Sequence, residues 1–136
     1  MTPKRAKQYF LNFDNALGRL ESAVIQDLSG NDLVVDAAIR RFKFSYELAW
    51  KLAKCVLNCN GIEANNPRSV IKESFKEGMI DGGQEWIDML EDRNKTLHIY
   101  DEAEAVKIYE KIKKVYYPLL EGFHVKIQGL IKEMEI

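Results

Sequence analysis

The sequence predicts an all-α protein, because apolar residues recur at helical spacing along nearly all of it and no stretch alternates convincingly at period two. Glycine, proline and asparagine interrupt this pattern at only a few places and divide the chain into segments. The 136 residues, 46% of them hydrophobic, are enough for one core and fit one domain over residues 1–136. We therefore expect an antiparallel up-and-down bundle of four long helices plus one short helix.

The first half of the chain is expected to form two long helices. Thr2 and Pro3 fit a cap and first-turn pair for the first helix, and residues 29–31 fit its stop. The apolar stripe of this helix contains Phe10, Phe13, Leu17, Leu20, Val24 and Leu28. The second helix, from about residue 32 to residue 60, carries two apolar stripes. It should therefore contact neighbours on two sides and leave apolar surface for self-association.

The aromatic residues of the second helix are expected in the core rather than on a base-stacking surface. They are Phe42, Phe44, Tyr46 and Trp50, which recur at helical spacing. Glu47 lies on the narrow polar strip that remains, where its order relative to Lys51 favours an i,i+4 ion pair.

The second half should contain one short and two longer helices. The short helix begins at residues 66–67, Asn-Pro, and closes at Gly78, and the Asp-Gly-Gly turn of residues 81–83 opens the fourth helix. Asp101 followed by Glu104 predicts a capping box that starts the last helix. An apolar stripe that includes Val115 and Leu119 keeps its phase across Pro118. We therefore expect one long helix kinked near Pro118.

Composition narrows the classes of function. Twenty basic residues against 21 acidic ones give a net charge of −1, so any contact with RNA must be local. Cys55 and Cys59 lie one helical turn apart without further ligands at metal spacing, so we expect them to be core residues and predict no metal site and no cofactor. No apolar signal core or membrane span is recognisable, so we expect a cytoplasmic protein.

The segment of residues 93–100, Arg-Asn-Lys-Thr-Leu-His-Ile-Tyr, is the candidate functional site, because these residue types suit chemistry on phosphate. Arg93 falls on the apolar stripe formed by Trp86, Leu90 and Leu97, whereas Asp92 falls among the charged residues of the opposite face. An arginine on the inward stripe needs a partner, either a carboxylate of a neighbouring helix or a ligand.

The position of His98 leaves two interpretations open. The five-residue step places His98 about 140° around an ideal helix from Arg93, so the two converge only if the helix loosens or a second chain contributes. His98 could otherwise cap the negative end of the helix dipole. Leu97 to Tyr100 are expected to form a frayed last turn or a tight junction.

Three segments together resemble the nucleotidyltransferase substrate-binding protein family. They are residues 41–51 (RFKFSYELAWK), residues 67–73 (PRSVIKE) and residues 86–94 (WIDMLEDRN). The resemblance spans nearly the whole chain and implies a helical bundle of the HEPN superfamily, similar to the HepT toxins that pair with MNT-type nucleotidyltransferase antitoxins. It also implies a homodimer.

The resemblance extends to the candidate site. Arg93, Asn94 and His98 match, in order, the R-x4-H motif of HEPN ribonucleases, in which a polar residue follows the arginine. Tyr100 completes the R-x4-H-x-Y form of the toxins, in which the tyrosine receives AMP groups from the partner enzyme. The resemblance thus implies catalytic roles for Arg93, Asn94 and His98 and modification of Tyr100.

Three functional interpretations follow. The first is a subunit that binds a nucleotide or macromolecular substrate for an MNT-type nucleotidyltransferase in a toxin–antitoxin-like pair. The alternative is a metal-independent HEPN ribonuclease that uses Arg93 and His98 and is neutralised by AMP on Tyr100. In the third, the same residues are structural.

Overall fold

The computed structural model describes residues 3–26, 31–98 and 101–134, and these are almost entirely helical. Its elements are α1 (Pro3–Val24), α2 (Asp32–Cys59), α3 (Pro67–Lys76), α4 (Gly83–Lys95), the 3₁₀ turn η1 (Thr96–His98), α5 (Glu102–Lys111), the π-helical segment η2 (Ile112–Tyr116) and α6 (Tyr117–Met134). The described ranges contain no strand, and the predicted all-α class is confirmed.

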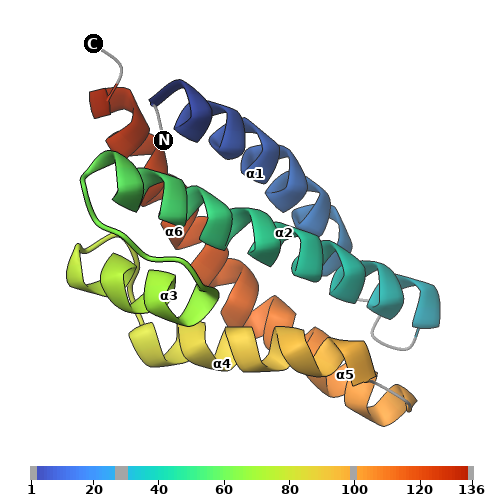
Figure 1. The fold of residues 1–136 in the computed structure, drawn as a ribbon. Coiled ribbons are helices and arrows are strands. Elements are labelled where there is room, and N and C mark those ends of the chain that lie inside the picture. The colour runs from blue at the N-terminus through green and yellow to red at the C-terminus, as the bar shows by residue number, and fades with distance from the viewer. Residues whose placement is uncertain (1–2, 27–30, 99–100, 135–136) are drawn as a thin grey trace.

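The chain runs up and down around α2 (Figure 1). α1 and α2 form an antiparallel pair, and the chain reverses direction again between α4 and α5. α2 contacts α1, α3, α4, α5 and α6, so it occupies the centre. α4, with 13 residues, is closer in length to the 10-residue α3 than to the 22-residue α1. The sequence predicts four long helices and one short helix, but the helix lengths do not divide so clearly into these two groups.

Local capping explains where the helices begin. The Asn31 side chain accepts hydrogen bonds from the first turn of α2. Asn66 and Ser69 form a reciprocal capping box at α3. At α5 the Asp101 carboxylate accepts a bond of 2.8 Å from the Glu104 N–H, so Asp101 is the cap, but the described contacts contain only this half of the predicted box. The first helix was predicted to stop at residues 29–31, but α1 already ends at Val24, and Asn31 instead caps α2. Residues 29–30 lie outside the described residues.

The last third forms one continuous helical run across Pro118. In η2 the bonding shifts to the i→i+5 pattern, as in the bond from the Tyr117 N–H to the Ile112 carbonyl. A π-helical turn relaxes the α-helical ladder just where proline, which has no N–H, would otherwise interrupt it.

The extra residue of this π-helical turn changes which side chains face inward. Val115, on the predicted stripe, is 38% exposed, whereas Tyr116 is 1% and Leu120 0% exposed. The sequence prediction was wrong here because it assumed 3.6 residues per turn throughout, whereas a π-turn advances the phase by about one residue.

The aromatic residues of α2 divide between core and surface. Phe42 and Tyr46 are fully buried, and Phe42 stacks on Tyr116 with ring centroids 5.5 Å apart. Trp50 is partly buried. The core prediction is wrong for Phe44, whose side chain is 61% exposed, because the helix is covered by neighbours on several but not all sides.

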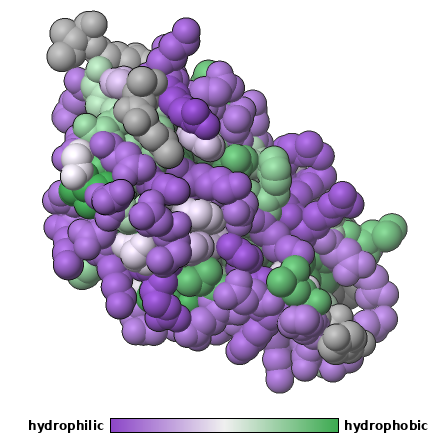
Figure 2. Space-filling view, in the orientation of Figure 1, coloured by the Kyte–Doolittle hydropathy of each residue, from purple (hydrophilic) through white to green (hydrophobic). Residues whose placement is uncertain are grey.

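Most apolar surface of α2 is used within the chain. As predicted, α2 contacts neighbours on more than one side, namely α1 and the later helices. Figure 2 shows a mostly hydrophilic face with separate small apolar patches. No helix of the described ranges is long and apolar enough to cross a membrane.

Candidate functional site

The C-terminal end of α4 holds Arg93 in a fixed position. Its side chain is only 21% exposed, and Nη2 donates to Glu47 Oε2 on α2 at 3.1 Å. Nη1 donates to Asn94 Oδ1 at 3.2 Å, and the guanidinium carbon lies 5.5 Å from the centroid of the Tyr46 ring. The inward position predicted for Arg93 is thus accompanied by a carboxylate partner, a neighbouring amide and an aromatic face.

Burial dominates the electrostatics of this arrangement. It raises the pKa of Tyr46 well above its ordinary value, against the opposing influence of Arg93. Among the described residues, the Tyr46 hydroxyl and Arg93 Nε are buried without a hydrogen-bond partner. The cluster therefore keeps hydrogen-bonding capacity that the described part of the chain does not fill.

His98 lies in a separate groove. It is an exposed residue of η1, and its groove of about 510 Å³ is lined by Asp92, Lys95, His98, Glu104, Lys107, Ile108 and Lys111. Within the described ranges, the His98 side chain forms no hydrogen bond or ion pair. Arg93 and Asn94 are not among the residues that line this groove. Tyr100 lies outside the described residues.

Asp92 forms the buried side of the His98 groove. It is 7% exposed, accepts a hydrogen bond from the Tyr116 hydroxyl, and lies 3.4 Å from Lys111 Nζ and 3.8 Å from Lys95 Nζ. Burial, and then the bond to Asp92, raises the pKa of Tyr116 above its ordinary value. Asp92 therefore ties α4 to α5 and η2 beside His98.

The sequence prediction that Asp92 faces solvent was wrong. Met89, three positions earlier, is fully buried and lies about 60° from Asp92 on a helical wheel. Including Met89 in the apolar stripe would have placed Asp92 at its edge. Leu97 was wrongly predicted inward: it is 62% exposed, because α4 ends at Lys95 and η1 continues at a different pitch.

Two further partners were missed. The predicted pair of Glu47 with Lys51 is present at 3.5 Å, but the sequence did not reveal the second partner of Glu47, Arg93. The contact of Lys111 with Asp92 in the groove was also not foreseen. No local spacing marks either contact, since the partners are 46 and 19 residues apart.

The two cysteines are not joined in a disulfide; Cys55 is buried and Cys59 partly buried. Burial raises the pKa of the Cys55 thiol. Across residues 3–26, 31–98 and 101–134, no group of three or more His, Cys, Asp and Glu side chains could hold a metal ion.

Comparison with known proteins identifies the family. Residues 8–129 match the family described as nucleotidyltransferase substrate binding protein like. The chain belongs to this family. One curated relative of this family member is the "Probable ribonuclease HepT" of Haemophilus influenzae (strain ATCC 51907 / DSM 11121 / KW20 / Rd). It is 30% identical over 114 residues, covering 73% of this chain and 78% of the relative.

Solved structures share the fold of this family member. A Thermus thermophilus protein superposes with a TM-score of 0.74 at 24% identity, covering 88% of this chain and 98% of its own. A Haemophilus influenzae protein superposes with a TM-score of 0.63 at 20% identity, and the match covers 93% of this chain and 99% of that protein's chain. The latter structure is described as revealing the fold of a substrate binding domain of a nucleotidyltransferase.

Proposed function

We propose that the protein binds a phosphate-bearing substrate, a nucleotide or a macromolecule, on behalf of an MNT-type nucleotidyltransferase in a two-component system. The observation that carries the proposal is the open groove of His98, where lysines from α4 and α5 meet. Lys107 forms no ion pair with a described carboxylate, so its charge is available to a phosphate. Membership of the nucleotidyltransferase substrate-binding family supports this role.

The site is proposed to be completed in a homodimer. Arg93 pairs with Glu47, whereas His98 lines the neighbouring groove, and a second copy would bring the two groups to one ligand. A twofold axis beside the end of α4 would bring Arg93 of one chain towards His98 of the other. Light scattering after size-exclusion chromatography should give twice the chain mass.

The second candidate function is a metal-independent endoribonuclease. It is favoured by the exposed ring of His98, which has no partner among the described residues, and by the relative named as a probable ribonuclease. In this reaction the ribose 2′-oxygen attacks the adjacent phosphorus, the bond from phosphorus to the 5′-oxygen breaks, and a 2′,3′-cyclic phosphate and a 5′-hydroxyl result. His98 would accept or deliver the proton, Arg93 would stabilise the phosphate charge, and Asn94 would orient Arg93 through its 3.2 Å contact.

Tyr100 is the proposed point of control in the ribonuclease interpretation. Its attachment to AMP would add negative charge two residues after His98 and compete with RNA phosphate for the same cations. Mass spectrometry after incubation with the partner transferase and ATP should show the AMP adduct, and Tyr100→Phe should lack it.

The deciding experiment measures binding and cleavage in parallel. The wild type, His98→Ala, Lys107→Ala and Arg93→Ala are titrated with ATP and with mixed-sequence RNA, and RNA cleavage is followed in EDTA. Lys72→Ala, an exposed lysine on α3, is the charge-matched control, and circular dichroism establishes equal folding. A binding subunit should lose affinity by about tenfold in Lys107→Ala without cleaving RNA.

The outcomes separate the interpretations. Cleavage by the wild type that disappears in both His98→Ala and Arg93→Ala would establish the ribonuclease. Unchanged binding and cleavage in all three site variants, with a lower melting temperature for Arg93→Ala, would refute both functions and leave a structural role.

A further inference from the structure

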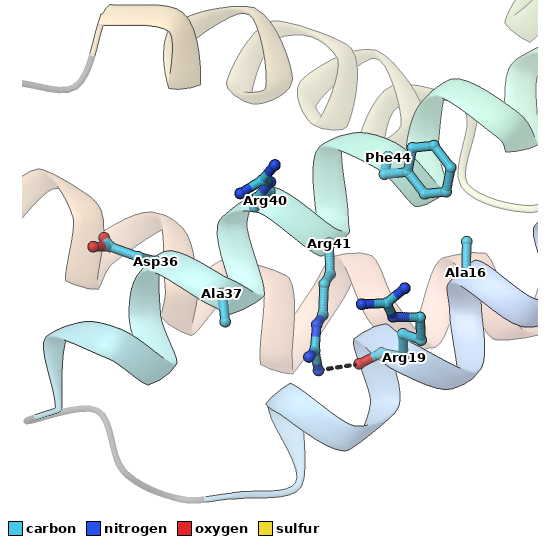
Figure 3. A pocket seen from close by; sticks show the side chains of 7 residues that line it. All are labelled: Ala16, Arg19, Asp36, Ala37, Arg40, Arg41 and Phe44. Carbon is cyan, nitrogen blue, oxygen red and sulfur yellow. Dashed lines mark hydrogen bonds between the residues drawn. The ribbon is translucent and has the colours of Figure 1, made fainter.

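A second basic groove lies between α1 and α2 and shares no lining residue with the groove of His98. It has a volume of about 590 Å³ and is lined by Ala16, Arg19, Asp36, Ala37, Arg40, Arg41 and Phe44 (Figure 3). Three of its seven lining side chains are arginines, in a protein whose overall net charge is −1. The positive charge is therefore a local feature of this groove.

The arginines are arranged to leave charge available. Arg41 donates from Nη1 to the main-chain oxygen of Arg19 at 2.8 Å, which fixes its guanidinium across the helix pair (Figure 3). Arg19 and Arg40 are exposed. Although Asp36 lines the same groove, none of the three arginines forms an ion pair with a carboxylate of the described ranges. Like charges held together without counter-charges favour an anionic ligand.

Phe44 adds an aromatic surface to this groove. Its side chain is 61% exposed and it follows Arg40 by one helical turn on α2. Ala16 and Ala37 are small, so the hollow between the helices stays open. Guanidinium groups beside an exposed aromatic ring are the combination that binds phosphates while a base stacks.

A second hollow connects this groove over α2 towards the end of α4. Arg40 and Asp36 line it as well, together with Lys43 and Thr96, so its two cationic side chains outnumber its one carboxylate. The Thr96 hydroxyl donates to the main-chain oxygen of Arg93 at 2.6 Å, so this hollow borders the candidate site. A single nucleotide would fill one hollow, whereas a strand with phosphates at regular intervals would follow both.

We propose that the groove between α1 and α2 binds the backbone of a single-stranded nucleic acid, with a base stacked on Phe44, and leads the strand over Arg40 towards the end of α4. This proposal specifies single-stranded nucleic acid as the substrate class of the proposed function. It rests on the proposed function for the statement that the strand leads to the end of α4. The binding step itself does not involve His98.

The test is fluorescence anisotropy of a labelled mixed-sequence oligonucleotide, as RNA and as DNA, with full-length protein. We expect Arg40→Ala and Phe44→Ala to weaken binding about tenfold, whereas Lys72→Ala and Phe75→Ala, on α3, should change it less than twofold. Arg40→Ala should also reduce the slope of log K against log salt by about 0.7, the value for one phosphate contact on a single strand. Phe44→Ala should leave that slope unchanged.

Several results would overturn the inference. They are equal losses in the control variants, wild-type affinity in both groove variants, and competition by free ATP or an acidic peptide as effective as that of unlabelled oligonucleotide. The His98→Ala variant distinguishes this failure from that of the proposed function. If the groove binds the strand but His98→Ala changes neither binding nor cleavage, only the role assigned to His98 fails.

Discussion

The buried bond between the Tyr116 hydroxyl and Asp92 should be a main energetic link between α4 and the last helical run. Tyr116 is 1% and Asp92 7% exposed, so the bond is largely shielded from water. A hydrogen bond to a charged group contributes about 1.5–3 kcal/mol, and we expect Tyr116→Phe to lower stability by about 2 kcal/mol. The remaining partners of Asp92, Lys95 and Lys111, have side chains 73% and 57% exposed and compensate little.

The expected change in melting temperature follows from chain length. Unfolding entropy of about 2.1 cal/mol/K per residue gives roughly 0.3 kcal/mol/K for 136 residues, so 2 kcal/mol corresponds to a decrease of about 7 °C. Differential scanning calorimetry measures it. A double-mutant cycle with Asp92→Ala should give a coupling energy of about 1–2 kcal/mol.

Tyr117 provides the matched control for this prediction. Its hydroxyl donates to Glu21 at 2.7 Å, but this bond is exposed, so Tyr117→Phe should cost less than about 1 kcal/mol. If Tyr116→Phe lowers the melting temperature no more than Tyr117→Phe does, or if the cycle shows no coupling, the link between Tyr116 and Asp92 is not the determinant we describe.

Three further predictions concern other parts of the fold. Glu47→Gln removes the charge that holds Arg93 and should lower the free energy of unfolding, measured by urea denaturation, by about 1 kcal/mol, because the 38% exposure of Glu47 reduces the effect. An unchanged urea midpoint would contradict this. Gly82→Ala should destabilise by about 1 kcal/mol or more, because its φ of +66° is a backbone conformation that L side chains rarely adopt. Gly122→Ala, in open space on α6, should stabilise by about 0.5–1 kcal/mol, so the melting temperatures of the two variants should move in opposite directions. Burial raises the pKa of Tyr46 in the folded protein above its unfolded value near 10. The contribution of the protonated hydroxyl to the free energy of unfolding is therefore fully present below that pH and is lost as the pH rises above it, so Tyr46→Phe should flatten the alkaline loss of unfolding free energy. An equally steep loss in the variant would refute this.

The candidate site shows how far sequence reasoning reaches. The inward position of Arg93 follows from its spacing to Trp86 and Leu90, and the structure shows it partly buried as expected. The identity of its partner does not follow, because Glu47 also has a plausible local partner in Lys51. Phe44 likewise has the helical spacing of a core residue, and only the placement of the neighbouring helices leaves it exposed beside the arginines.

Local sequence is enough to set the helical class, the caps at Asn31, Asn66 and Asp101, and the continuous run through Pro118, because these depend on interactions within about one turn of the chain. Three other features arise only when the helices pack: Asp92 is buried against Tyr116, Arg93 pairs with Glu47 while His98 lines a separate groove, and three arginines line one groove between α1 and α2. Those contacts depend on the angles at which the helices cross and on the phase shift of the π-helical turn. The packing of the whole core sets both.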